Sequence, residues 1–277
     1  MPVEEDVARH YTSGNLLERI RQGLATMGRD PDHPSLDDLK PVDEFHIGGV
    51  EATGDLLAQI DLGPRSALLD IGSGLGGPAR FIASNTGCHV TGIDLTEEFV
   101  ATAGALSEMT GLAGRTSFIV GSALDLPFAP ASFDAATLIH VGMNLPDKPV
   151  LFAGVARVLR PGRVFAVYDV MRTGPGELAY PVPWAETAAT DFSAPPDAYR
   201  VAAAAAGFTI AAERVRRDFA LDFFRARAAG AAGQDGPPPL GIHLLTGTTG
   251  PEKMRNMITN IEAGVIAPVE MICSLGD

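Results

Sequence analysis

The stretch that decides the fold runs from Ala67 to Ile82 and reads ALLDIGSGLGGPARFI. It opens with an apolar run that suits a fully buried strand, continues into a glycine-rich turn, and ends in a helical pattern with Phe81 and Ile82 on its apolar face. Glycines let the chain turn sharply and let a ligand approach the backbone closely. The helix beyond directs its free N–H groups at whatever lies over the turn. The sequence therefore predicts a ligand-binding strand–turn–helix unit.

Asp70 distinguishes between the ligands that such a turn could hold. Gly72, Gly74 and Gly77 have the spacing of a dinucleotide-binding turn, which is a weak signal by itself. A pyrophosphate gains nothing from a carboxylate at the strand end, whereas a ligand with an ammonium group and a sulfonium does. The unit resembles motif I of the class I S-adenosylmethionine (SAM)-dependent methyltransferases, in which this acidic residue lies near the methionine end of SAM. The resemblance implies further cofactor contacts from the turn: Gly72, Ser73, Gly74, Gly76 and Gly77.

Composition and charge narrow the classes of partner. The chain has 277 residues, of which 46% are hydrophobic, and this is enough for one large α/β domain with additions or two small domains. A formal net charge of -13 argues against a nucleic-acid partner. The acidic N-terminus does not look like a signal peptide, and no apolar run approaches membrane-spanning length. We therefore expect a cytoplasmic protein with neither a nucleic-acid nor a membrane partner.

The two cysteines predict neither a disulfide nor a metal site. Cys88 and Cys273 each lie in an apolar, strand-like run, which favours buried free thiols. The spacing of cysteine and histidine residues matches no metal-ligand pattern. We expect no bound metal.

Strand and helix patterns alternate along most of the chain. Apolar runs predict six strands after the first, over residues 89–94, 116–120, 133–139, 163–170, 208–216 and 265–275. Such alternation with helices favours a parallel sheet covered on both faces. The resemblance implies a doubly wound, Rossmann-like α/β sheet of seven strands, mostly parallel with the last strand antiparallel. A ligand should lie at the carboxyl ends of the strands.

Two segments stand outside this alternation. Residues 1–62 predict a helical N-terminal lid or cap, with a Pro/Asp-rich loop over residues 30–41 between two helices. Residues 63–277 are then the SAM-binding domain, in which residues 217–264 form a late helical insertion. We expect the cap and the insertion to shape the pocket for the methyl acceptor.

The second and third predicted strands lead to residues that suit the ribose and adenine of SAM. Asp94 ends a strand at about the 20-residue offset where an acidic residue meets a ribose in such folds. A carboxylate can accept hydrogen bonds from both hydroxyls of a vicinal diol, although Asp94 could instead only begin the next helix. The resemblance implies ribose binding by Asp94 beside Leu95. It implies adenine contact by Ser122, Ala123 and Leu124, although relatives usually carry an acidic residue at position 122.

His140 follows the fourth predicted strand at the expected mouth of the pocket. The stretch around it resembles the small-molecule branch that includes the ubiquinone-biosynthesis and sarcosine/dimethylglycine methyltransferases. Methyl transfer is an in-line displacement, so catalysis is mostly positioning. A hydroxyl or ammonium nucleophile must also lose a proton, and histidine is the usual acceptor near neutral pH. His140 is therefore the candidate base, or else it only packs against SAM. Met143 and Asn144 are candidate acceptor contacts.

The segment before motif I supplies a second candidate base. Residues 43–53 resemble a segment that closes over the methionine end of SAM in this branch. His46 could contact SAM or the acceptor, or lie in solvent at a helix start. Tyr11 could reach the pocket from a lid helix, or be a core tyrosine. An apolar acceptor pocket could be lined by aromatic residues that could instead be plain core: Trp184, Phe192, Phe219, Phe223 and Phe224.

The sequence thus predicts a SAM-dependent methyltransferase that acts on a small molecule through an oxygen, nitrogen or carbon nucleophile. It would release S-adenosylhomocysteine. The literal glycine spacing leaves an NAD(P)-dependent oxidoreductase as one alternative, against which Asp70 argues. A catalytically silent SAM-binding protein is the other.

Overall fold

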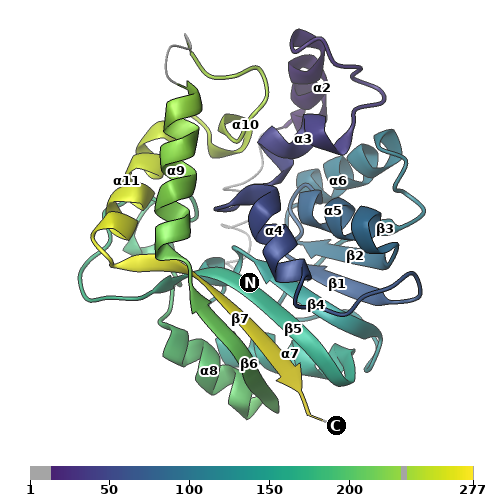
Figure 1. Cartoon of the computed structure of the whole chain (residues 1–277), viewed down its shortest axis with the longest axis vertical. Helices are drawn as coiled ribbons and strands as arrows, with labels where there is room; N and C mark the ends of the chain where they lie inside the picture. Colours follow the sequence, from purple (N-terminus) through teal and green to yellow (C-terminus); the bar gives the residue numbers. More distant parts are fainter. Residues whose placement is uncertain (1–13, 232–235, 277) are drawn as a thin grey trace.

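A computed structural model describes residues 14–231 and 236–276 of the chain. Its centre is one seven-stranded sheet, in the order β3-β2-β1-β4-β5-β7-β6 (Figure 1). Strand β7 runs antiparallel to β5 and β6, and the other pairings are parallel. The sheet predicted from the sequence is therefore confirmed. The strands are β1 (Ala67–Ile71), β2 (His89–Asp94), β3 (Thr116–Val120), β4 (Phe133–Ile139), β5 (Leu159–Arg172), β6 (Phe208–Val215) and β7 (Ile266–Leu275).

The strand order places a switch point between β1 and β4. From β1 the chain winds outward through β2 to β3, and then it returns to β4 on the other side of β1. The segments that follow β1 and β4 therefore run in opposite directions from the carboxyl ends of these strands. Such a crevice is the general ligand site of open α/β sheets.

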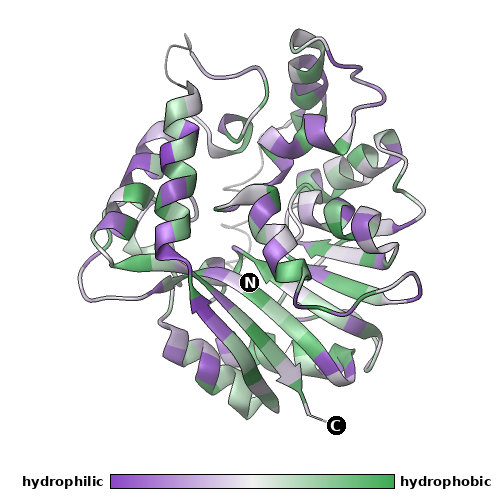
Figure 2. Cartoon of the chain, in the orientation of Figure 1, coloured by the Kyte–Doolittle hydropathy of each residue, from purple (hydrophilic) through white to green (hydrophobic). Residues whose placement is uncertain are grey.

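Helices cover both faces of the sheet (Figure 1). On one face, apolar side chains of α4 and α5 pack on β1, β2 and β4, and on the other those of α7 and α8 pack on β4, β5 and β7. Hydrophobic colour runs through the central strands, whereas the helices carry polar outer sides (Figure 2). The helices around the sheet are α4 (Gly49–Leu57), α5 (Gly77–Thr86), α6 (Glu97–Met109), α7 (Lys148–Val158) and α8 (Pro196–Ala205).

Two further groups of helices flank the carboxyl ends of the strands. The N-terminal group is α2 (Leu16–Thr26) and α3 (Leu36–Asp43), and the late group is α9 (Arg217–Ala231), α10 (His243–Thr246) and α11 (Gly250–Glu262). The late group holds a hydrophobic cluster of its own, which includes Phe224, Met257 and Ile261. The two groups face each other across the site (Figure 1).

Helix α3 lies where the sequence predicted a loop. Ser35 caps it with a complete capping box, in which the Ser35 side chain accepts a hydrogen bond from the Asp38 backbone N–H and the Asp38 carboxylate accepts one from the Ser35 N–H. The cap fixes two otherwise unpaired backbone donors, and this outweighs Pro41 inside the helix. The density of proline and aspartate had obscured that signal.

The expectation for the two cysteines is confirmed. Cys88 and Cys273 are buried free thiols. Over the described residues, none of the helices combines the length and apolarity needed to cross a membrane. The same residues contain no cluster of histidine, cysteine and acidic side chains suited to a metal ion.

Candidate active site

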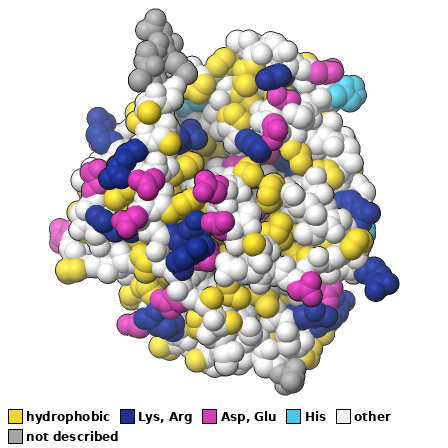
Figure 3. Space-filling model, in the orientation of Figure 1, with side chains coloured by type: hydrophobic (Ala, Val, Ile, Leu, Met, Phe, Trp, Pro, Cys, Tyr) yellow, Lys and Arg dark blue, Asp and Glu magenta, His cyan; other side chains and the backbone are white. Residues whose placement is uncertain are grey.

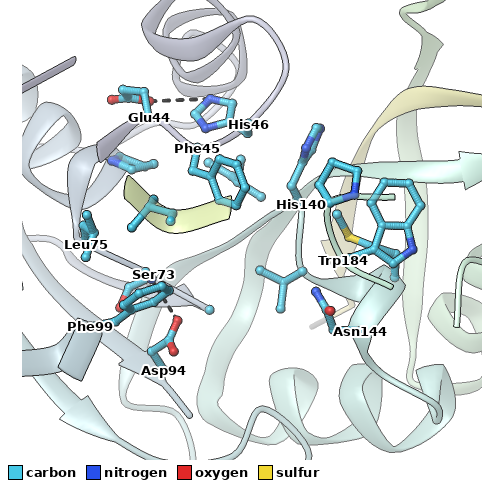
Figure 4. A pocket seen from close by; sticks show the side chains of 18 of the residues that line it. Glu44, Phe45, His46, Ser73, Leu75, Asp94, Phe99, His140, Asn144 and Trp184 are labelled. Carbon is cyan, nitrogen blue, oxygen red and sulfur yellow. Dashed lines mark hydrogen bonds and ion pairs between the residues drawn. The ribbon is translucent and has the colours of Figure 1, made fainter. Parts of the chain in front are cut away.

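A cavity of about 400 Å³ opens at the carboxyl ends of β1, β2 and β4, between the N-terminal and the late helices. In the space-filling view this face is hollowed between the same two groups, with hydrophobic side chains around the hollow (Figure 3). The close-up shows Ser73 and Asp94 on one side, Glu44 and His46 on another, and His140, Asn144 and Trp184 toward the third (Figure 4). Segments distant in sequence thus meet around one space.

The glycine turn after β1 has two kinds of glycine. Gly72 has φ +70°, and a Cβ there would lie 2.3 Å from a methyl carbon of Val141. Gly74 has φ +52°, yet nothing lies within 4 Å of where its Cβ would be, because it borders the cavity. Gly76 and Gly77 do not line the cavity. A Cβ on them would meet the Phe118 ring and the Asp43 carbonyl oxygen respectively, so their visible role is close packing.

Asp94 closes the turn from the neighbouring strand. Its Oδ2 accepts a hydrogen bond from the Gly74 N–H at 2.9 Å, and its Oδ1 accepts one from the Thr96 N–H at 2.9 Å. Burial raises the pKa of this carboxyl, and these two backbone donors oppose that rise. The carboxylate is therefore held in one orientation at the cavity wall beside Leu95, with lone pairs left for a ligand.

Asp70 ends β1 beneath the turn and does not itself line the cavity. Only 2% of the residue is exposed. Its Oδ1 accepts a hydrogen bond from Thr137 Oγ1 at 2.8 Å, whereas its Oδ2 has no partner within the described part of the chain. Burial raises the pKa of Asp70 to about 6.

The positions predicted for adenine are divided. Ala123 and Leu124 line the cavity, but Ser122 does not, and its hydroxyl accepts a hydrogen bond from the Leu124 N–H at 3.0 Å. Ile93 and Phe99 also line this end of the cavity. The sequence analysis missed these two because they read as ordinary core residues of a strand and a helix.

His140 stands in a strained backbone conformation at the centre of the site. Its φ is +55°, in the left-handed region that residues with a side chain rarely adopt. Its N–H donates to the Tyr168 carbonyl oxygen at 2.7 Å, and its ring centroid lies 5.1 Å from that of Tyr168. Burial and the nearby His46 hold the pKa of His140 well below its usual value, so the imidazole is neutral. Strain of this kind is typical of functional sites.

His46 lies across from His140, with 5.9 Å between the ring centroids. Its Nε2 is 3.0 Å from the Gly49 carbonyl oxygen. Because a carbonyl oxygen only accepts, Nε2 carries the hydrogen, and Nδ1 is left as the acceptor nitrogen. Burial lowers the pKa of His46 to about 4, so this ring is neutral as well. Both predicted histidines therefore border the cavity as uncharged bases.

Glu44 belongs to the same cluster, and the sequence analysis missed it. Its Oε2 accepts a hydrogen bond from Thr53 Oγ1 at 3.2 Å and lies 3.5 Å from His46 Nε2. Its side chain is 4% exposed. The resemblance implied that residues 43–53 close over the methionine end of SAM, but His46 was singled out in that segment because an acidic side chain such as Glu44 is usually exposed.

The late helices give the cavity an apolar wall. Phe223, a predicted residue, lines this wall from α9. Three other predicted residues also line the cavity: Trp184, and Met143 and Asn144 of the short helix η1 (Gly142–Asn144). The Trp184 ring is fixed because its Nε1 donates to Asp191 Oδ1 at 2.8 Å. Tyr11 lies outside the described residues. Phe224, a further aromatic residue considered for this pocket, lines it as well. Sequence analysis missed the remaining members of this wall, which are Ile242, Leu245, Met254 and Met257.

Comparison with known proteins identifies the family. A family model described as a methyltransferase domain matches residues 69–167. The O-methyltransferase rstn1 of Aspergillus nomiae is 32% identical over 160 residues, which cover 58% of this chain and 68% of that protein. The chain belongs to the class I SAM-dependent methyltransferases. Sterol 24-C-methyltransferase ERG6B of Gibberella zeae is 38% identical over 118 residues, 43% of this chain and 31% of that protein. The chain thus matches under a third of the length of this sterol enzyme.

Solved structures show the same fold. The geranyl diphosphate C-methyltransferase of Streptomyces coelicolor A3(2) superposes with a TM-score of 0.71 and 17% identity, over 99% of this chain and 98% of that one. Its structure contains S-adenosylhomocysteine, Mg²⁺ and geranyl diphosphate. At this identity the likeness concerns the fold alone.

The cofactor of the methyltransferase family fits the polar side of the cavity. Buried polar groups normally have hydrogen-bond partners. Four atoms at or beside the cavity have none among residues 14–231 and 236–276: Asp70 Oδ2, Ser73 Oγ, His140 Nε2 and Asn144 Oδ1. Together with the open backbone at Gly74, they match a ligand that has cationic, hydroxyl and amino groups, as SAM has.

Proposed function

We propose that this methyltransferase moves the methyl group of SAM to a small, largely apolar acceptor and releases S-adenosylhomocysteine. The observation that carries the proposal is one cavity with two unlike walls. Polar atoms and open glycine backbone form the wall at β1 and β2, and aromatic and methionine side chains form the wall at α9 and α11. His140 lies between them. Such a cavity suits two ligands placed end to end.

Each part of SAM has a candidate contact. Asp94 holds the two ribose hydroxyls, and Ala123 and Leu124 flank the adenine. Asp70 and Ser73 face the methionine end across the glycine turn. SAM, when bound, supplies an electrophilic methyl group. The protein's own contribution is to hold the acceptor in line with that methyl and to keep water out.

His140 takes the proton that an acceptor hydroxyl, amine or activated carbon loses. A neutral imidazole is required for this step, and burial keeps the ring neutral. Its Nε2 has no partner among the described residues, so it is free to accept. His46 offers Nδ1 from the opposite side and is the second candidate.

The wall at α9 and α11, which we call the acceptor wall, favours an uncharged acceptor over a diphosphate. Arg227 is the one cation among the described residues that line the cavity, and it is exposed. A diphosphate carries several negative charges and needs several cations or a metal ion. We therefore propose an acceptor unlike the geranyl diphosphate named for the structural neighbour. Residues 217–264 and the N-terminal segment shape this acceptor end.

Methyl-labelled SAM tests the proposal directly. The protein is incubated with it and a panel of apolar phenols, enols, carboxylic acids and amines, and with geranyl diphosphate plus Mg²⁺. Label in an apolar acceptor supports the proposal, and its chemical class identifies the nucleophile. Label only in geranyl diphosphate would contradict the acceptor assignment. S-adenosylhomocysteine binding with no label in any acceptor would favour a silent SAM-binding protein.

A further inference from the structure

Two buried acidic residues belong to the site: Glu44 lines the cavity, and Asp70 lies beneath the glycine turn. Glu44 comes from the segment between α3 and α4, and Asp70 comes from the end of β1. The negative charge of Asp70 is one of the causes that raise the pKa of Glu44. Each accepts one hydroxyl hydrogen bond, from Thr53 and Thr137 respectively. One neutral donor apiece does not compensate for burying two negative charges.

The charged groups around Glu44 do not supply the missing positive charge. Arg80, from α5, is fully buried, but its Nη2 is 2.7 Å from Asp43 Oδ2, so it compensates a third acid. His46 lies 3.5 Å from Glu44 yet is neutral. Asp43 and Asp70 add only negative charge. The cluster of Glu44, Asp43, Asp70, Arg80 and His46 therefore holds more buried acid than base.

The cluster meets this imbalance by keeping a proton. Burial, helped by Asp43 and Asp70, raises the pKa of Glu44 to about 8. Burial raises the pKa of Asp70 to about 6. At pH 7 the Glu44 carboxyl is therefore mostly protonated, whereas Asp70 is mostly ionised.

We propose that Glu44 is a second carboxylate for the ammonium group of the cofactor, and that cofactor binding expels the Glu44 proton into solvent. In this step the O–H bond of the carboxyl breaks and the proton passes to buffer. The ammonium keeps its three hydrogens and donates to the carboxylate that remains. The inference rests on the proposed function, because it takes SAM or S-adenosylhomocysteine as the ligand.

The geometry supports this role independently of titration. Glu44 and Ser73 both line the cavity, and Asp70 Oδ2 is unpartnered beside it. Thr53 and His46 hold the Glu44 carboxyl from the side of α4, so it cannot turn to bulk water. A ligand ammonium between Glu44 and Asp70 would meet an acceptor from the N-terminal segment and another from the sheet.

Calorimetry on the full chain measures the expelled proton. Binding of S-adenosylhomocysteine is titrated at pH 7 in phosphate and in Tris, whose heats of ionisation differ, and the difference gives the protons released. We expect close to one proton per ligand for the wild-type protein, since a group with a pKa of about 8 is mostly protonated at pH 7. The matched ligand is 5′-methylthioadenosine, which keeps the nucleoside but has no ammonium group. We expect it to release almost none.

Glu44→Gln removes the titrating group and keeps the shape of the side chain. We expect proton release with S-adenosylhomocysteine to disappear and affinity to fall about 10-fold, since a charge-assisted hydrogen bond is lost. Affinity for 5′-methylthioadenosine should stay the same. Glu51→Gln, at an exposed position of α4, is the control and should match the wild type.

The outcomes separate this inference from the proposed function. Equal proton release with both ligands, or S-adenosylhomocysteine binding without release, overturns the role of Glu44 and leaves the methyltransferase proposal intact. Absence of any S-adenosylhomocysteine binding overturns both. The comparison of the two ligands uses only the wild-type protein, so it decides the matter even if Glu44→Gln fails to fold.

Discussion

The wall of the cavity at β1 and β2, the cofactor wall, presents glycine backbone and the polar side chains of Ser73 and Asp94 among apolar residues, whereas the wall at α9 and α11, the acceptor wall, is made of large apolar side chains. The first wall depends on turn geometry, in which Gly72 and Asp94 have few substitutes. The second needs only hydrophobic bulk, which many sequences provide. The family match covers residues 69–167, which include the glycine turn, Asp94 and His140 but none of the late helices. We therefore expect the cofactor wall to be shared within the family and the acceptor wall to vary.

The largest effect of a substitution is expected at His140, which lies between the two walls. His140→Ala removes the proposed proton acceptor, and general-base catalysis of this kind contributes about 100- to 10,000-fold to the rate. We expect kcat for a hydroxyl or amine acceptor to fall within that range, with the affinity for S-adenosylhomocysteine nearly unchanged. His89→Ala, at an exposed position of β2, is the control. Unchanged turnover with intact cofactor binding would remove His140 from the mechanism.

A pair of glycine substitutions tests the cofactor wall. Gly72→Ala forces a Cβ to within 2.3 Å of Val141, at a φ of +70°. We expect it to lower the free energy of unfolding by about 2–4 kcal/mol, from overpacking and backbone strain together. Gly74→Ala introduces backbone strain of the same kind, but the added Cβ meets no protein atom within 4 Å. Its cost in stability should be about 1–2 kcal/mol.

Ligand binding separates the two glycines further. The new methyl at Gly74 points into space that the cofactor needs, so S-adenosylhomocysteine should bind Gly74→Ala much more weakly than the wild type. Urea unfolding and calorimetry measure the two quantities. Equal stability of both variants, or full cofactor affinity in Gly74→Ala, would show that the turn does not work as described.

Sequence reasoning succeeded where one residue type has few alternatives. The succession of strands along the chain and the glycine turn follow from local patterns that few other structures explain. Asp94, His46 and His140, to which the family resemblance also pointed, line one cavity. Helix α3 was missed because its capping box lies within a proline-rich stretch. Glu44 was missed because burial of an acidic side chain is a property of tertiary packing, which a local pattern does not encode.

The acceptor wall was only partly predictable for a related reason. Trp184 and Phe223 stood out as aromatic residues, but Met254 and Met257 read as one apolar face of a helix. The same apolar pattern occurs on helices that pack into a core and on helices that line a pocket. Which of the two it forms depends on how α9 and α11 pack over the sheet.

A substitution in the acceptor wall should leave the cofactor wall unaffected. Phe223→Ala removes a partly buried ring from the cavity. We expect the KM for an apolar acceptor to rise about 10-fold, because burying such a ring against a ligand contributes about 1.5–3 kcal/mol, part of which the neighbouring side chains recover. The affinity for S-adenosylhomocysteine should change less than twofold. An equal loss of both affinities would mean that the two walls are not separable.

The smallest effect concerns the stability of the ligand-free protein as pH changes. The pKa of Glu44 is raised to about 8, so the folded state holds a proton that the unfolded chain has lost, and stability falls as pH rises toward 8. The pKa of His46 is lowered to about 4, so its contribution has the opposite sign and is lost as pH falls below about 6.5. The two oppose each other in acid, and of these two groups only Glu44 contributes to the slope between about pH 6.5 and 8.

In that window we expect the free energy of unfolding to fall by about 1 kcal/mol per pH unit, measured by urea titration at several pH values. Glu44→Gln should flatten the slope, whereas Glu51→Gln, from an exposed position, should keep it. A saturating cofactor should flatten it too, because the ammonium group keeps Glu44 ionised in the complex. A slope that survives in Glu44→Gln would assign the proton to another group. It would also remove the charge imbalance on which the two-carboxylate site depends.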